Sequence, residues 1–147
     1  MTAPANPPPS DPWIRRALVT GWLLLAISLP LGLTLEALHG LKIQVYLGSA
    51  LRRELWTLAH AHANLLGILC LVFAGFGPTW FAIPAQRVIG LGLVLGAVAM
   101  PLGFFAGGVL NSEGDPSLGI LLVPLGGVAL LVALVRAAFS GCRAAPE

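Results

Sequence analysis

Charged residues are scarce in this sequence. Lysine and arginine number 8, and aspartate and glutamate 6, among 147 residues, so 10% of the chain is charged. An ordinary soluble domain carries about 25% charged residues. The few cations are also dispersed along the chain, which excludes the continuous basic surface that a nucleic-acid-binding protein needs. The sequence thus predicts a protein in contact with lipid and without a nucleic-acid partner.

Cysteine is equally scarce, with 2 in the chain. Cys70 lies in the middle of an apolar stretch and Cys142 in the C-terminal tail, so neither a disulfide nor a zinc site of the Cys-x-x-Cys type is predicted. The sequence also lacks a phosphate-binding glycine loop and a Ser/His/Asp set for nucleophilic catalysis. These absences exclude common soluble-enzyme motifs and leave the 3 histidines as the main source of chemistry.

Apolar residues are abundant: 57% of the chain is hydrophobic, and its mean hydropathy is +0.90. A helix that crosses a hydrocarbon core of roughly 30 Å needs about 20 apolar residues. Four windows meet that length or come close to it: residues 17–38, 55–76, 88–110 and 118–135. Their apolar runs are continuous rather than alternating, which excludes a transmembrane β-barrel. The predicted fold is all-α, an integral membrane four-helix bundle.

The domain organisation follows from these windows. Residues 1–16 are rich in proline and lack a periodic apolar pattern, so a disordered tail is predicted there. Residues 17–138 form the transmembrane domain, and residues 139–147 form a second tail. Within the domain, a long loop joins the first two spans and the turn-rich GPTWFAIPAQR separates the second from the third.

The distribution of cations predicts an orientation. With four spans, both tails and the middle loop share one side of the membrane, together with Arg15, Arg16, Arg87, Arg136 and Arg143. The other side has Lys42, Arg52 and Arg53, so the split of the 8 cations is five to three. Cytoplasmic loops carry the excess of arginine and lysine, so both tails are predicted to lie in the cytoplasm. The predicted location is the inner (cell) membrane.

Glycines recur at four-residue spacing in the third span. The pairs are Gly92 with Gly96 and Gly103 with Gly107. Such spacing lets helix backbones approach closely in lipid, where no hydrophobic force drives helices together. The pattern predicts a tight bundle, formed either within one chain or in a homo-oligomer.

Polar residues inside the membrane boundary are costly and are functional-site candidates by default. Here they gather at the side opposite the tails, where the first span ends, the second begins and the third gives way to the fourth. The set comprises Glu36, His39, His60, His62, Asn64, Asn111, Glu113 and Asp115.

Helical geometry divides this set by face. At 100° per residue, Glu36 and His39 are about 60° apart and His60 and Asn64 about 40° apart, whereas His62 lies about 200° round from His60. One helix cannot chelate a single metal ion with both His60 and His62, because chelation requires a spacing of three or four residues. Their spacing instead indicates two different partners on two sides of the helix.

Neutral imidazole is a common ligand for haem iron, copper and zinc, and a low-dielectric site favours the uncharged form. His39, His60 and His62 are therefore candidate ligands of haem or a metal ion. The alternative is structural: the histidines hydrogen-bond to one another, to Glu36 or to backbone carbonyls and hold the helices together.

The stretch HANLLGILCLVFAGF, residues 62–76, resembles the second helix of the catalytic subunit of heme-copper oxidases of the nitric oxide reductase and cbb3 type. In that helix a His-x-Asn pair opens an apolar run, and the histidine is an axial ligand of low-spin haem b. The longer AHAHANLLG is similar to small four-helix membrane proteins often described as oxidase subunit I-like. The resemblance implies that His62 binds haem b, that Asn64 lies beside it and that the ligand lies in the outer half of the membrane.

Catalysis by this chain alone is not predicted. Oxidases and reductases of the resembling superfamily need further histidines on later helices, and no histidine follows His62. The sequence instead predicts a simpler haem site near the outer face, with fewer histidine ligands than those enzymes have. One ligand is His62 or His60, and the other is His39 or a histidine of a second subunit, with Glu36 and Asn64 close by.

Three functions are compatible with this sequence. The first is haem b binding for electron transfer, with a quinol or another respiratory subunit as partner, or an accessory role in a respiratory complex. The second is a cofactor-free structural or assembly protein of the membrane. The third is a small proton-linked transporter that uses Glu36 and the histidines as a relay.

Overall fold

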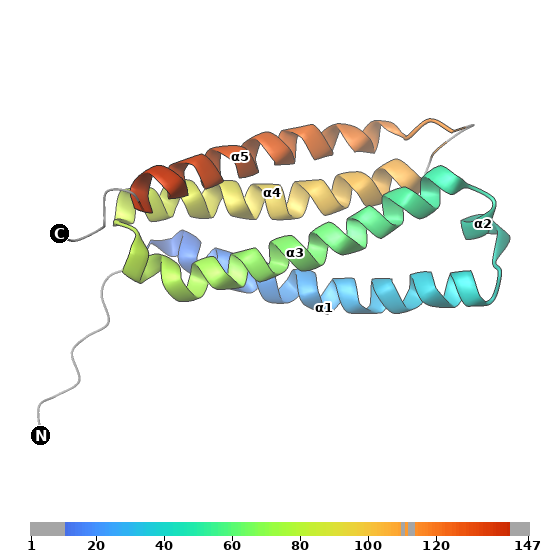
Figure 1. The fold of residues 1–147 in the computed structure, drawn as a ribbon, viewed down its shortest axis with the longest axis horizontal. Coiled ribbons are helices and arrows are strands. Elements are labelled where there is room, and N and C mark those ends of the chain that lie inside the picture. Colours follow the sequence, from blue (N-terminus) through green and yellow to red (C-terminus); the bar gives the residue numbers. More distant parts are fainter. Residues whose placement is uncertain (1–10, 110, 112–113, 142–147) are drawn as a thin grey trace, which may run out of the picture.

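The computed structural model describes residues 11–109, 111 and 114–141, and these fold into a bundle of helices (Figure 1). The long helices are α1 (Pro12–Gly40), α3 (Ala50–Trp80), α4 (Ile83–Val109) and α5 (Leu122–Gly141). Two short helices connect them, namely α2 (Gln44–Leu47) and the 3-10 helix η1 (Leu118–Leu121). The prediction of an all-α four-helix bundle is confirmed.

Each long helix meets the length and hydropathy that a membrane crossing requires, with η1 and α5 counted together as Leu118–Ser140. Large apolar side chains cover the outside of the bundle; Leu29 and Leu125, for example, are 67% and 65% exposed. Water would penalise such a surface, whereas lipid does not. The chain is therefore a multi-pass membrane protein.

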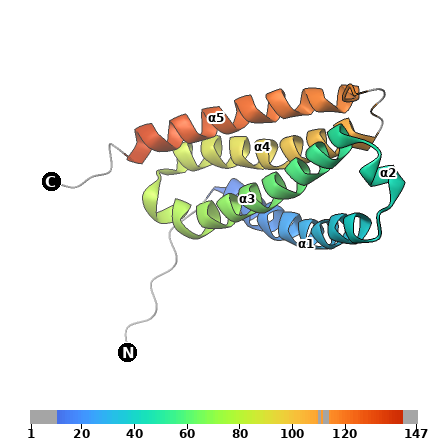
Figure 2. The same ribbon diagram turned by 45° about the vertical axis from the view of Figure 1, so that its right-hand side comes forward.

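Helix α4 lies in the middle of the bundle. It packs against α1, α3 and α5, whereas α5 packs mainly against α4 (Figures 1 and 2). The start of α1, the end of α5 and the α3–α4 turn share one end of the bundle, here called the turn end. Helices α2 and η1 lie at the opposite end, here called the α2 end (Figure 1). The tails and connections are thus distributed between the two ends as four alternating spans predict.

Helix α1 begins at Pro12, so the predicted tail over residues 1–16 is too long at its C-terminal side. Asp11 caps the helix: its carboxylate accepts a hydrogen bond from the backbone N–H of Trp13 at 3.0 Å. Proline is favoured in the first turn because its missing N–H would have no helical partner there. A capping residue followed by proline therefore favours helix from Pro12 onward, although the proline-rich composition of residues 1–16 predicts a disordered tail. Residues 1–10 lie outside the described part.

The turn-rich stretch predicted between the second and third spans is mostly helix. Helix α3 continues to Trp80 and α4 starts at Ile83, so Phe81 and Ala82 make the whole connection. The prolines mislead for different reasons: Pro84 lies in the first turn of α4, where a proline costs little, whereas Pro78 lies inside α3, which continues past it to Trp80. The Gln86 side chain donates to the carbonyl of Phe81 at 2.7 Å and closes this turn.

The long loop predicted at the other end also contains helix, because α2 forms within it and α3 starts at Ala50. Ser49 caps α3 by accepting from the backbone N–H of Arg52 at 3.2 Å, as its place before the apolar run indicates. The Arg52 side chain donates to the carbonyl of Gly108 and to Asn111 Oδ1, both at 2.9 Å, and to the carbonyl of Val45. Arg52 thus ties α2, α3 and the end of α4 together.

The glycine pairs of α4 are used within the chain. A Cβ on Gly92 would lie 2.6 Å from the carbonyl oxygen of Ala129, and one on Gly96 would lie 2.9 Å from that of Gly126. In the second pair, a Cβ on Gly103 would lie 2.9 Å from the backbone nitrogen of Val123 in the first turn of α5, and one on Gly107 would lie 3.3 Å from the Ile120 side chain of η1. Because α5 occupies this face, it is not free for a second copy of the chain. The glycine pairs thus serve close packing of α4 and α5 within one chain.

Candidate functional site

His60 joins α3 to α1 by reciprocal hydrogen bonds. Its Nδ1 lies 3.0 Å from both the carbonyl oxygen and the Oγ of Ser28, and Ser28 Oγ donates to the carbonyl of His60 at 3.1 Å. A carbonyl oxygen only accepts hydrogen bonds, so the bond to it places the ring proton on Nδ1. Ser28 is fully buried, which makes this contact part of the α1–α3 interface.

The Asn64 side chain covers the other side of the His60 contact. Its amide nitrogen donates to the carbonyl of His60 at 3.1 Å and lies 3.2 Å from Nε2 and 3.5 Å from Nδ1, which places it over the face of the ring. The ring itself lies against Gly32, where a Cβ would be 2.5 Å from its Cε1 atom. These contacts fix the His60 ring within the α1–α3 interface.

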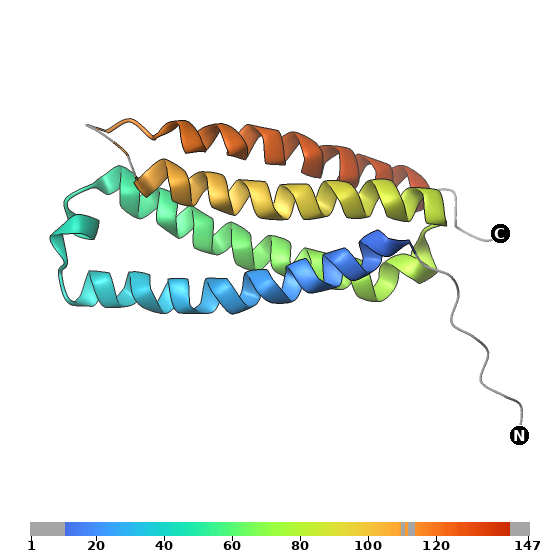
Figure 3. The same ribbon diagram turned by 180° about the vertical axis from the view of Figure 1, so that it is seen from behind.

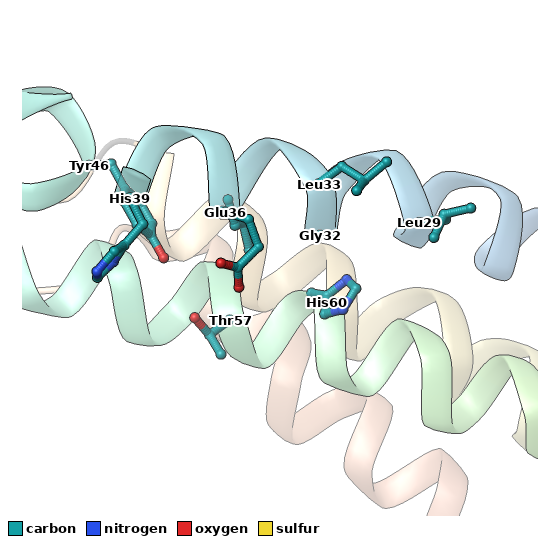
Figure 4. Close-up of a pocket in the computed structure, with 9 residues that line it drawn as sticks. Leu29, Gly32, Leu33, Glu36, His39, Tyr46, Thr57 and His60 are labelled. Atoms are coloured by element: carbon teal, nitrogen blue, oxygen red, sulfur yellow. The ribbon is translucent and has the colours of Figure 1, made fainter. Parts of the chain in front are cut away.

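A pocket of about 530 Å³ opens beside His60, between α1 and α3 near the α2 end. Figure 4 shows Glu36 and His39 on α1 directed toward α3, from which Thr57 and His60 face them. Tyr46 of α2 closes one side, and its ring meets that of His39 edge-on at a centroid distance of 6.5 Å. The structure therefore brings together three predicted residues, Glu36, His39 and His60, from two helices.

The sequence did not single out Gly32, Tyr46 and Thr57, which line this pocket, or Ser28, which bonds to His60 beside it. A signal for two of them existed, because Ser28, Gly32 and Glu36 follow one another at four-residue spacing and so share a face of α1. No such pattern marks Tyr46, whose place depends on how α2 folds back.

His62 lies on the α4 side of α3, away from this pocket. Its ring packs against Phe104 of α4 at a centroid distance of 4.8 Å, and the side chain is partly exposed. Nδ1 is 2.8 Å from the carbonyl oxygen of Leu58, one turn earlier in the same helix. Because that oxygen can only accept, Nδ1 carries the proton and Nε2 keeps its lone pair. His62 thus presents an imidazole nitrogen that can bind a ligand.

The three histidines consequently do not form one site. His60 contacts α1 and His62 contacts α4, so they lie on different sides of α3, as their spacing predicts. His39 lies with His60 and cannot share an iron atom with His62 of the same chain. Among the described residues, no group of three or more His, Cys, Asp or Glu side chains could hold a metal ion. A single metal site built from all three histidines is therefore excluded.

The remaining polar residues of the predicted set do not join either histidine. Asn111 accepts from Arg52 at 2.9 Å and donates to Ser49 Oγ at 3.0 Å, so it closes the loop end of α4. Asp115 is exposed, and Glu113 lies outside the described residues. In the described part, every buried side-chain nitrogen and oxygen has a hydrogen-bond partner.

Comparison with known proteins adds no relative: no protein-family model matches the chain, and neither a curated protein nor a solved structure matches it.

Proposed function

We propose that this protein binds haem b through His62 and acts in electron transfer, or as an accessory to a respiratory complex, in the inner membrane with both tails in the cytoplasm. The observation that carries the proposal is the 2.8 Å hydrogen bond from His62 Nδ1 to the Leu58 carbonyl. Metal-ligating histidines almost always donate the other ring N–H to a carbonyl, a carboxylate or water, which fixes the tautomer. The five-to-three split of cations supports the orientation.

The residues around His62 would hold a haem through one protein ligand. The Leu58 carbonyl holds the tautomer, and Phe104 packs on the imidazole and fixes its plane. Haem bound there would supply one-electron chemistry. A second imidazole does not fit, because His39 and His60 lie on the α1 side of α3. Because the chain has 3 histidines, a second imidazole ligand would have to come from another subunit.

Titration of the purified chain with ferric haem tests this proposal. We expect one haem per chain, a Soret band, and binding of carbon monoxide to the reduced form of the monomer, because one chain supplies one histidine ligand. A monomeric reduced form that does not bind carbon monoxide would show two protein ligands within one chain, which contradicts the geometry. Absence of a Soret band at saturating haem would overturn the proposal.

A cofactor-free structural role is the second candidate. It is favoured by the His60 contacts, since Ser28 of α1 bonds both to the His60 ring and to the His60 carbonyl across the α1–α3 interface. Interhelical hydrogen bonds in membranes average about 0.6 kcal/mol, so the three contacts between His60 and Ser28 would stabilise the α1–α3 pair modestly. This function becomes the better account if the titration shows no haem.

A further inference from the structure

A second polar pocket lies at the turn end of the bundle, remote from both histidine sites. It has a volume of about 480 Å³ and lies in the groove between α1 and α4. Two arginines lie at its mouth, and apolar side chains line the rest of the pocket along the helices. The lining residues are Pro12, Arg15, Arg16, Val19, Thr20 and Val94. Figure 3 shows the start of α1 beside α4 at this end.

The groove runs from the membrane boundary into the membrane. Gln86 of α4 accepts a hydrogen bond from the backbone N–H of Asp11 at 3.0 Å, so these two residues lie at the same level. Val19 and Val94 are each eight residues further along helices that run in the same direction. At 1.5 Å per residue, both lie about 12 Å deeper. The pocket therefore has a cationic mouth and an apolar floor.

The charge at the mouth is not neutralised by the described residues. Asp11, the nearest acid in sequence, has a side chain that is 1% exposed and is paired with Arg87 at 3.2 Å. Arg15 and Arg16 form no ion pair within the described part of the chain. The Arg16 guanidinium lies 4.2 Å from the centre of the Trp13 ring, which restrains it at the boundary. Two positive charges thus face the headgroup region.

We propose that this groove is a binding site for one anionic phospholipid. The phosphate group would lie at Arg15 and Arg16, where guanidinium groups bind phosphate oxygens in a fork geometry. One acyl chain would run over Val19 and Val94. An inorganic phosphate ion would gain nothing from this apolar half, and a zwitterionic lipid would gain less from the two arginines. The site does not depend on the haem proposal.

The test uses the full chain in neutral detergent, with phosphatidylglycerol and phosphatidylcholine added in separate titrations. Native mass spectrometry counts bound lipids, and the melting temperature reports binding. We expect one phosphatidylglycerol retained per chain, in preference to phosphatidylcholine. A surface cation contributes about 1 kcal/mol to binding of anionic lipid, so Arg15→Gln and Arg16→Gln should each weaken it about fivefold and the double variant about 25-fold.

Arg136→Gln is the matched control, because Arg136 lies on α5 at the same end and bonds to Ser140 instead. It should bind phosphatidylglycerol like the wild type, and Arg15→Lys and Arg16→Lys should retain most of the affinity. The lysine variants also keep the test valid should a glutamine variant fail to fold. The proposal would be overturned by equal retention of the two lipids, by equal weakening in the Arg136→Gln control, or by competition from inorganic phosphate at millimolar concentration.

Discussion

Replacing His62 by leucine is expected to remove the haem b signal from membranes that contain this protein, whereas replacing His60 by leucine is expected to leave it. The difference follows from the two environments. His62 keeps a free Nε2 after its bond to Leu58, whereas the His60 ring is bonded to Ser28 of α1 and covered by the Asn64 amide. The measurement is a reduced-minus-oxidised difference spectrum of membranes at equal protein content.

The two variants should also differ in their effect on the stability of the bundle. His60→Leu should lower the stability of the bundle in a detergent titration, because Ser28 and Asn64 lose their partner. His62→Leu should change stability little, since its ring makes one bond within its own helix. A haem signal that survives in His62→Leu and vanishes in His60→Leu would reverse the assignment of the two residues.

Replacing Gly92 by leucine should separate α5 from α4. A Cβ at this position meets the backbone carbonyl of Ala129 at 2.6 Å, and backbone cannot move aside as a flexible side chain can. Overpacking of this kind costs up to about 3 kcal/mol. The free energy of unfolding, measured by titration with denaturing detergent, should fall by about that amount. Because α5 packs mainly on α4, no other contact offsets the loss.

Gly127→Leu on α5 is the matched control for this prediction. A Cβ at Gly127 has nothing within 4 Å, so the added side chain would extend into lipid. Its effect on the free energy of unfolding should stay within about 0.5 kcal/mol. Equal destabilisation by the two substitutions would mean that the glycine stripe of α4 does not face α5.

Much of the fold could be predicted from the sequence because lipid imposes strong constraints. A continuous apolar run of about 20 residues must be helical in a bilayer, and four runs separated by turn signals leave one topology of alternating spans. The helix ends were less predictable. Asp11 with Pro12 extends α1, and Pro84 begins α4 rather than ending a loop, because a proline in a first turn breaks no hydrogen bond.

The candidate site was predictable only in part, because the sequence pattern does not determine how each helix is rotated about its own axis relative to its neighbours. The periodicity of α3 shows that His60 and His62 face different ways, but not which neighbour each one meets. That choice depends on where small residues let backbones approach, as at Gly32, which makes room for the His60 ring. Packing of this kind involves residues distant in sequence, and no local pattern reveals it.

The assignment of His62 as the ligand and His60 as the interhelical contact can be tested in a single sample. The chain has 3 histidines, so ring-labelled [15N]histidine gives few signals, which single variants can assign. Before haem is added, His60 and His62 should each show a protonated Nδ1. After addition of reduced haem with carbon monoxide, which is diamagnetic, the Nε2 resonance of His62 should shift while those of His60 and His39 stay in place. A shift at His60 or His39 instead, or no shift at any histidine, would contradict the account.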